Sequence, residues 1–216
     1  MPYRRTPQTQ ARLDRQRDAI LAAATDQLAD AGYAGCSMAA VAARAGVGTG
    51  SVYRHFPAKA DLVAEVFHEV VTREVAAVRA AASHGDAVDR VVAVLETFAG
   101  RALKAPKLAY ALLAEPVDAA VDAQRLVFRR AFRDVIATTI TEGVAEGVLG
   151  EQDPMLSAAA LVGAGAEAML GPLTGETAGP DTVSDLIRFT TRALGGRLAT
   201  PSVASGVSSY PLGGLR

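Results

Sequence analysis

The 216-residue sequence has a single cysteine, Cys36, few aromatic side chains and no long hydrophobic run. One cysteine forms no intramolecular disulfide, which indicates a reducing compartment. The N-terminus lacks the apolar segment of a secretory signal. The most apolar run, Met155–Ala166, is too short to span a bilayer before it meets Glu167. We therefore expect a cytoplasmic protein.

The sequence also lacks the spacings that metal and catalytic sites require. The three histidines, His55, His68 and His84, are not arranged as metal ligands and have no cysteine partner. No grouping of serine, histidine and acid is readable. Cys36 has no basic residue within three positions, so we expect a small buried side chain rather than a redox sensor. We expect no enzyme activity, metal or cofactor.

Positive charge is scarce outside the first 60 residues. Residues 1–60 hold eight Lys/Arg and four acidic residues, a net charge of +4, and the remainder holds 14 and 19, a net charge of −5. A basic head on an acidic body indicates that only the head meets a polyanion. The alternative is a solvated N-terminal tail.

Apolar residues recur at helical spacing along most of the chain, and no strand or internal repeat is apparent. The first helix is expected over about Leu13–Ala31, with its apolar stripe at Ile20, Leu21, Ala24 and Leu28. Two short helices follow, one capped by Ser37 and one with Val52 and Phe56 facing inward. Six further helical segments are expected over 58–82, 86–103, 106–116, 118–147, 153–173 and 179–196.

The stretch AGVGTGSVYRHF, Ala45–Phe56, contains three alternating glycines, as loops that bind nucleotides do. The dinucleotide fingerprint requires a preceding strand and a glycine where this chain has Ser51, and the Gly-Lys-Ser/Thr of a phosphate loop does not follow. Two short helices, Ser37–Ala45 and Thr49–His55, are instead joined by the tight turn Gly46–Gly48. This arrangement is typical of a DNA-binding helix-turn-helix.

The stretch MAAVAARAGVGTGSVYRHFPAKADLVAEVF resembles the DNA-binding signature of the TetR/AcrR family of bacterial repressors. The resemblance covers about residues 15–67 and includes the Ala-x-x-Ala-Gly-Val turn, Tyr53, His55-Phe56 and Lys59-x-x-Leu62. It implies a homodimer with about nine helices per subunit, in which three form the DNA head and the last two pair with the partner. It also implies a small ligand in the C-terminal domain that shifts the heads and releases the operator.

The resemblance further implies seven DNA-contacting residues. Those expected to meet phosphate or sugar are Ser37, Tyr53, His55 and Lys59. Those expected to face bases are Thr49, Gly50 and Ser51. Thr49 stands where the family often has lysine, and Ala39 is short where some members read a base, so DNA shape is expected to carry more of the recognition. Arg4 and Arg5 either reach the minor groove as an arm or merely solubilise the tail.

The body offers few aromatic side chains that could line a ligand cavity. The candidates are Phe98, Tyr110, Phe128 and Phe132, with Glu167 as a polar anchor. A cavity between Ala/Leu/Val-rich helices favours a mostly apolar effector, cationic if Glu167 points inward. Core packing is the alternative for the aromatic residues. Glu167 could instead face solvent or pair with an arginine, because an unpaired buried acid is costly.

Two other groups have simpler interpretations. The acidic residues Glu115, Asp118 and Asp122 are expected to form a solvated helix start, since acids favour helix N-termini. The small residues Ala159, Ala160, Gly163 and Ala164 allow close helix approach, either in a dimer or within one chain.

We therefore expect an all-α protein with four parts: a flexible basic arm (1–14), a helix-turn-helix domain (15–60), a ligand-binding and dimerisation domain (61–198) and a disordered tail (199–216). The expected function is a ligand-responsive repressor that binds a palindromic DNA operator as a homodimer. An activator or global regulator of the same fold is the alternative. An α-helical enzyme and a protein-binding adaptor are the other classes.

Overall fold

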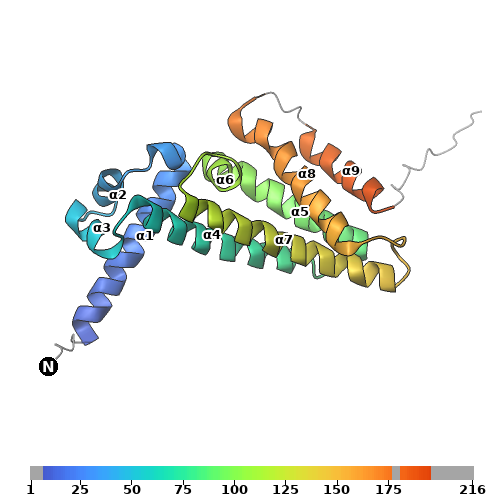
Figure 1. The fold of residues 1–216 in the computed structure, drawn as a ribbon, viewed down its shortest axis with the longest axis horizontal. Helices are drawn as coiled ribbons and strands as arrows, with labels where there is room; N and C mark the ends of the chain where they lie inside the picture. The colour runs from blue at the N-terminus through green and yellow to red at the C-terminus, as the bar shows by residue number, and fades with distance from the viewer. Residues whose placement is uncertain (1–6, 177–180, 196–216) are drawn as a thin grey trace, which may run out of the picture.

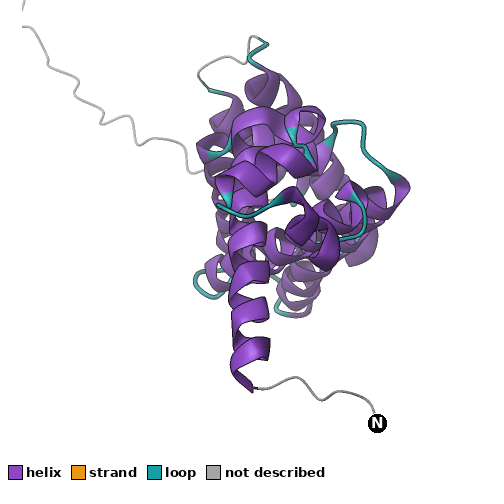
Figure 2. Ribbon diagram, turned by 90° about the vertical axis from the view of Figure 1, so that its left-hand side faces the viewer, coloured by secondary structure: helices purple, strands orange, loops and turns teal. Residues whose placement is uncertain are grey.

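The computed structural model describes residues 7–176 and 181–195, and every regular element in these ranges is an α-helix (Figures 1 and 2). The helices of the described ranges are α1 (Pro7–Gly35), α2 (Met38–Arg44), α3 (Thr49–His55), α4 (Lys59–Ala81), α5 (Ala87–Lys104), α6 (Pro106–Leu113), α7 (Ala119–Ala145), α8 (Pro154–Thr174) and α9 (Thr182–Ala193). The all-α expectation is confirmed. The expected tail (199–216) and the arginines Arg4 and Arg5 lie outside the described residues.

The helices form a small head and an elongated body (Figure 1). Helices α1, α2 and α3 pack together at one end, and α4 leads from this head into the body. In the body, α4 and α5 pack against α7, and α8 packs against α7, α6 and α9. The short helix α6 packs against α1, so the body also contacts the head beside the α4 connection.

The apolar stripes predicted for the head form its core. Ile20, Leu21, Ala24 and Leu28 of α1 are buried, together with Met38, Val41 and Ala42 of α2. Val52 and Phe56 also point inward, with 0% and 4% of their surface exposed. Burying these side chains is the main stabilising contribution to such a small unit. The outer faces of its helices are consequently left to polar residues.

Helix α1 is longer than expected at both ends. It begins at Pro7 rather than near Leu13, so residues 7–14 of the expected flexible arm are helical. Proline is well suited to the first turn of a helix, and the glutamine, arginine and alanine residues that follow favour helix without an apolar stripe. Near its other end α1 is kinked at Gly32, whose φ of 68° lies in the left-handed region that glycine adopts readily.

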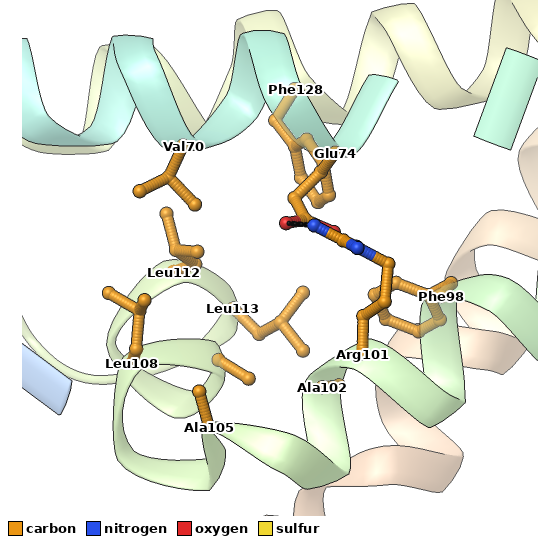
Figure 3. A pocket seen from close by; sticks show the side chains of 11 residues that line it. Val70, Glu74, Phe98, Arg101, Ala102, Ala105, Leu108, Leu112, Leu113 and Phe128 are labelled. Atoms are coloured by element: carbon orange, nitrogen blue, oxygen red, sulfur yellow. Dashed lines mark hydrogen bonds and ion pairs between the residues drawn. The ribbon is translucent and has the colours of Figure 1, made fainter. Parts of the chain in front are cut away.

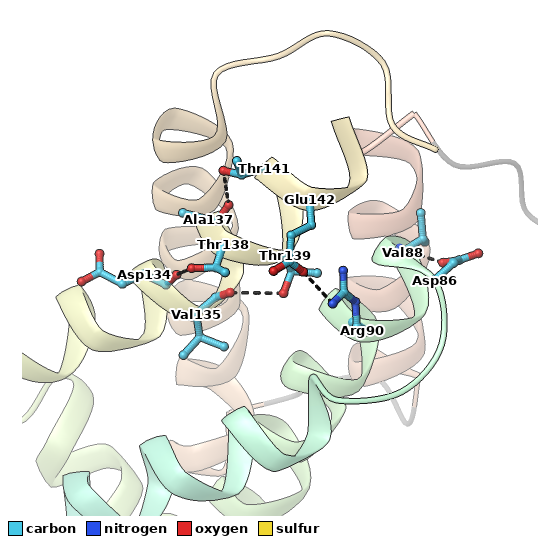
Figure 4. A network of polar contacts seen from close by, with 10 residues as sticks. All are labelled: Asp86, Val88, Arg90, Asp134, Val135, Ala137, Thr138, Thr139, Thr141 and Glu142. Carbon is cyan, nitrogen blue, oxygen red and sulfur yellow. Dashed lines mark hydrogen bonds and ion pairs between the residues drawn. The ribbon is translucent and has the colours of Figure 1, made fainter. Parts of the chain in front are cut away.

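Polar contacts fix the end of the body farthest from the head (Figure 4). The Asp86 carboxylate caps α5 by accepting hydrogen bonds from the amides of Val88 and Asp89, at 2.8 and 2.9 Å. Arg90 of α5 forms an ion pair with Glu142 of α7, with 2.7 Å between Nη1 and Oε2. The ion pair holds α5 and α7 side by side at this end of the body.

Helix α8 is more extensive than the apolar run that the sequence suggested. It continues beyond Ala166 to Thr174, and by length and composition it could cross a membrane. A packed helix of a helical bundle meets the same criterion. Only 28% of its most apolar window is buried within this chain, however. One face of α8 is therefore uncovered in the monomer.

Candidate DNA interface and ligand cavity

Helices α2 and α3 are joined by a tight turn, as a helix-turn-helix requires. The Ser37 hydroxyl caps α2 by accepting a hydrogen bond from the Ala40 amide at 3.2 Å, as predicted. Gly46 turns the chain with a φ of 67°. The Val47 amide then returns to the Ala42 carbonyl at 3.0 Å. The turn fixes the angle at which α3 leaves the head.

The outer face of α3 is open. Thr49, Gly50 and Arg54 are exposed, and Tyr53 has 51% of its surface exposed. Ser51 is half-buried beside the inward-facing Val52. A side chain built at Gly48 or Gly50 would meet no other atom within 4 Å. The start of α3 thus presents bare backbone, which allows a large surface to approach closely.

Three of the residues predicted to contact DNA differ in their exposure and in their contacts within the chain. Ser37 is exposed at the start of α2. His55 is half-buried, and its Nε2 lies 3.1 Å from Oε1 of Gln16, which ties α3 to α1. Lys59 is half-buried as well, because its Nζ donates a 2.6 Å hydrogen bond to the Tyr33 carbonyl and lies 3.9 Å from the centroid of the Tyr33 ring. Lys59 must leave this carbonyl to reach another partner.

Arg54 is a basic residue of this face that the sequence did not single out. Two other arginines of the head are engaged: Arg44 pairs with Asp30 at 2.6 Å and Arg17 with Glu65 at 2.9 Å. Arg54 is exposed and forms no ion pair among the described residues. Its position between Tyr53 and His55, which were both predicted to contact DNA, was the sequence feature that could have identified it. It leaves a positive charge on an otherwise neutral polar face.

A cavity of about 70 Å³ lies between α4, α5, α6 and α7 (Figure 3). Its walls are Val70, Phe98, Ala102, Ala105, Leu108, Ala109, Leu112, Leu113 and Phe128. Two charged residues complete the lining. Arg101 of α5 binds Glu74 of α4 through two hydrogen bonds, at 2.5 and 2.7 Å, and neutralises it. No sequence pattern links these two residues, which lie on different helices.

A smaller cavity of about 20 Å³ lies next to this one and shares Leu113 with it. Phe98 and Phe128 line both cavities, and Phe132 lines the smaller one. The ring centroid of Phe132 lies 5.5 Å from that of Phe98 and 4.6 Å from that of Phe128. The two cavities therefore share part of their aromatic lining.

The other two residues predicted for the cavity lie elsewhere. Tyr110 is half-buried and lines neither cavity, because the cavity face of α6 carries Leu108, Ala109 and Leu112, and position 110 points away from it. Glu167 is exposed on α8 and also lines neither cavity. Solvent provides the charge stabilisation that an unpaired buried carboxylate would lose.

Cys36 has the packing role that its sequence context favours. Its side chain is buried, with 2% of its surface exposed. Burial raises the pKa of the thiol, although the nearby Lys59 ammonium acts in the opposite direction. A thiol with a raised pKa is a poor nucleophile and a poor metal ligand at neutral pH. Among the described residues, no group of three or more His, Cys, Asp and Glu could hold a metal ion.

The described residues thus form an all-helical chain whose head contains a helix-turn-helix with an open outer face on α3. Residues 20–66 match the family model described as bacterial regulatory proteins, tetR family. The match covers the helix-turn-helix head, so residues 20–66 are similar to the DNA-binding region of bacterial regulatory proteins of the tetR family. A comparison with curated proteins found no significant match.

Solved structures support this fold over nearly the whole body. A putative TetR-family transcriptional regulator from Rhodococcus sp. has a TM-score of 0.70 and 23% identity, and the alignment covers 83% of this chain and 98% of that one. The transcriptional regulator FadR from Bacillus subtilis, in complex with stearoyl-CoA, has a TM-score of 0.71 and 18% identity, covering 84% and 99%. RolR, in complex with its ligand resorcinol, has a TM-score of 0.66 and 16% identity, covering 87% and 91%.

Proposed function

We propose that this protein is a cytoplasmic repressor that binds a palindromic operator as a homodimer and is released from it by a small molecule. The observation that carries the proposal is the open outer face of α3, held on a head whose core is closed. This face has exposed hydroxyls, bare backbone at Gly50 and an exposed arginine, Arg54, that forms no ion pair with any residue the structure describes. These groups suit close contact with phosphates and base edges in a major groove.

The DNA contacts proposed on this face have two kinds of role. Thr49, Gly50 and Ser51 lie at the start of α3 and face the bases. Tyr53, His55 and Ser37 contact phosphate or sugar at the groove wall, and we add Arg54 as a further phosphate ligand because its charge is unpaired. Lys59 joins them by exchanging the Tyr33 carbonyl for a phosphate oxygen.

The proposed dimer forms through α8 and α9. The exposed residues of α8 recur at helical spacing and are mostly small or apolar: Met155, Leu156, Ala159, Ala160, Gly163, Glu167 and Thr174. Leu156 and Phe189 of α9 have 69% and 53% of their surfaces exposed. Covering such a face with its own copy removes apolar surface from water and lets the two backbones approach closely at Gly163.

The proposed effector is a mostly apolar small molecule that enters the cavity between α4 and α7. Phe98, Phe128 and Phe132 form its aromatic walls. The paired charges of Arg101 and Glu74 favour an uncharged ligand, because a charged one must break their ion pair. A water molecule needs about 10–15 Å³ of cavity volume, so a cavity of about 70 Å³ holds about five water molecules. A larger effector therefore requires the walls to move.

The DNA part of the proposal is tested by selecting duplexes from a random library with the purified protein. The expected product is an inverted repeat with half-sites about 34 Å apart or somewhat more. Affinity for the selected duplex is then measured over a salt series. Lys59→Ala should lower the salt slope by about one unit per half-site, and Tyr53→Phe should weaken all sequences alike.

Lys104→Ala is the matched control, since Lys104 is an exposed lysine of the body. It should leave both affinity and salt slope unchanged. If Tyr53→Phe and Lys59→Ala also bind as the wild type does, the proposed orientation of the head on DNA is wrong.

The release part is tested with a small-molecule library screened by thermal shift. Each compound that stabilises the wild type is tested again on Phe128→Ala and Phe132→Ala, and its effect on operator affinity is measured. A ligand releases DNA only to the extent that it prefers the unbound state, and a tenfold loss corresponds to about 1.4 kcal/mol. Compounds that stabilise all three proteins equally would locate the effector site elsewhere.

A further inference from the structure

The kink near the end of α1 diverts two backbone amides from the helix to the body. At Gly32 the chain leaves helical geometry, and the amides of Tyr33 and Ala34 point to the Glu115 side chain. The two carboxylate oxygens accept these hydrogen bonds at 2.8 and 2.9 Å. Glu115 lies in the loop after α6. Its carboxylate thus anchors the last turn of α1, in the way that a capping carboxylate binds the free amides at a helix terminus.

Glu115 is itself fixed by α7. Arg125, whose side chain is only 11% exposed, donates from Nη2 to the carbonyl oxygen of Ala111 at 2.7 Å and to that of Glu115. These carbonyls belong to the end of α6 and the loop that follows it. The loop and the Glu115 carboxylate therefore move together with α6 and α7.

Other contacts at this junction join the same two parts. The Nζ of Lys107, on α6, donates a 2.5 Å hydrogen bond to the Asp30 carbonyl, near the kink of α1. The Tyr33 hydroxyl donates to Asp118, in the loop before α7. Glu115 and Asp118, which the sequence suggested were solvated, are thus partners of the head.

The helix that carries this junction is also a wall of the cavity. Leu108, Ala109, Leu112 and Leu113 of α6 line it, and Glu115 follows two residues after Leu113. On α7, Phe128 lines the cavity one turn after Arg125. An effector larger than the cavity that displaces α6 or α7 also moves the Glu115 carboxylate, which is attached to both helices.

On the head side, the contact leads to a proposed DNA ligand. The amide of Tyr33 is bound by Glu115, and its carbonyl is bound by Nζ of Lys59 at 2.6 Å. Tyr33 is buried, with 8% of its surface exposed, and therefore cannot shift without its neighbours. A displacement of Glu115 is thus passed through one residue to the lysine that is proposed to grip phosphate.

We infer that Glu115 is the residue through which the cavity positions the DNA head: an occupied cavity displaces α6, and Glu115 transmits this displacement to Tyr33 and Lys59. This inference rests on the proposed function. A merely structural Glu115 would stabilise the head equally, whatever the cavity contains. If Glu115 transmits the displacement, the effect of filling the cavity on operator affinity depends on Glu115. If Glu115 is only structural, that effect is the same with and without it.

The test replaces the unidentified effector with a side chain. Ala109→Phe places a benzene ring in the cavity from α6 and forces the helix outward, since overpacked cores respond by backbone shifts. Affinity for the selected operator is measured for the wild type, Ala109→Phe, Glu115→Ala and the double variant. Glu142→Ala, alone and with Ala109→Phe, is the matched control, because its ion pair with Arg90 lies at the far end of the body.

We expect Ala109→Phe to weaken operator binding about tenfold, a coupling of ordinary size for two linked sites. In the Glu115→Ala background the same change should weaken it less than about twofold, and in the Glu142→Ala background still about tenfold. Hydrogen exchange at the Tyr33 and Ala34 amides should accelerate in Ala109→Phe. Glu115→Gln, which keeps the shape and one acceptor oxygen, repeats the test if Glu115→Ala does not fold.

An equal loss of affinity on adding Ala109→Phe with and without Glu115 would overturn the inference. So would an Ala109→Phe variant that folds with a displaced α6 and binds the operator as the wild type does. If the wild type selects no DNA sequence at all, the proposed function fails instead.

Discussion

The outer face of α3 and the cavity of the body satisfy their polar groups in opposite ways. On α3 the side chains of Thr49, Tyr53 and Arg54 make no hydrogen bond or ion pair within the described part of the chain. In the cavity, Arg101 and Glu74 bind each other at 2.5 and 2.7 Å. The polar groups of the first surface are open to water or to a partner, whereas those of the second satisfy each other. The head is therefore ready to bind a polar polymer, and the cavity best accepts an apolar molecule.

The comparison predicts its largest effect on protein stability: replacing an inward-facing aromatic residue should cost far more than replacing an outward-facing one. Phe132→Ala removes a ring that is 4% exposed and should lower the free energy of unfolding by about 3–5 kcal/mol. Tyr53→Ala, at 51% exposure, should change it by less than about 0.5 kcal/mol. Urea unfolding followed by circular dichroism measures both. Similar losses in the two variants would mean that Tyr53 also belongs to the core.

Adding charge to the outer face should break its function without affecting the fold. Gly50→Asp introduces a carboxylate where bare backbone is proposed to meet DNA, and it should weaken operator binding about 100-fold, or about 2.7 kcal/mol. A Cβ at Gly50 meets nothing within 4 Å, so the melting temperature should change little. Gly150→Asp, at an equally open position between α7 and α8, is the control. Equal binding by the two variants would contradict the proposed approach of DNA to α3.

The uncovered stripe of α8 adds a third surface, which is outward yet apolar. Gly163→Arg should give a folded monomer, because a Cβ at this position meets nothing within 4 Å in the chain. Losing the second half-site should weaken operator binding at least about tenfold. Light scattering and operator titration measure the two effects, with Gly100→Arg on α5 as the control. A Gly163→Arg dimer would move the interface to another face.

The smallest predicted effect concerns the junction between head and body. Burial, followed by the hydrogen bond to Asp118 and its charge, raises the pKa of Tyr33 to about 12. The unfolded chain loses this proton near pH 10, so the free energy of unfolding should decrease as pH rises from 10 to 12. Tyr33→Phe removes this contribution and should show a shallower decrease in urea unfolding. Parallel curves for the two proteins would indicate an unperturbed hydroxyl.

The head was more predictable than the cavity because its determinants are local. The cap at Ser37, the turn at Gly46 and the inward positions Val52 and Phe56 all follow from spacing within one short stretch. Phe98, Phe128 and Phe132 were predicted as cavity candidates because the body has few aromatic side chains. The charged pair of the cavity was not, because Glu74 and Arg101 meet only after α4 and α5 pack. Glu115 was taken for a solvated acid for the same reason: its partners lie about 80 residues earlier in the chain.

The three alanines of the cavity wall, Ala102, Ala105 and Ala109, have an evolutionary consequence. A single nucleotide change turns an alanine codon into one for valine, threonine, serine or glycine, so each position can enlarge, shrink or polarise the cavity in one mutational step. None of the three lies in the head, so such changes leave the DNA-reading side chains unaltered. Under the proposed function, a lineage carrying this fold could thus change the chemical signal it detects while keeping the set of genes it controls.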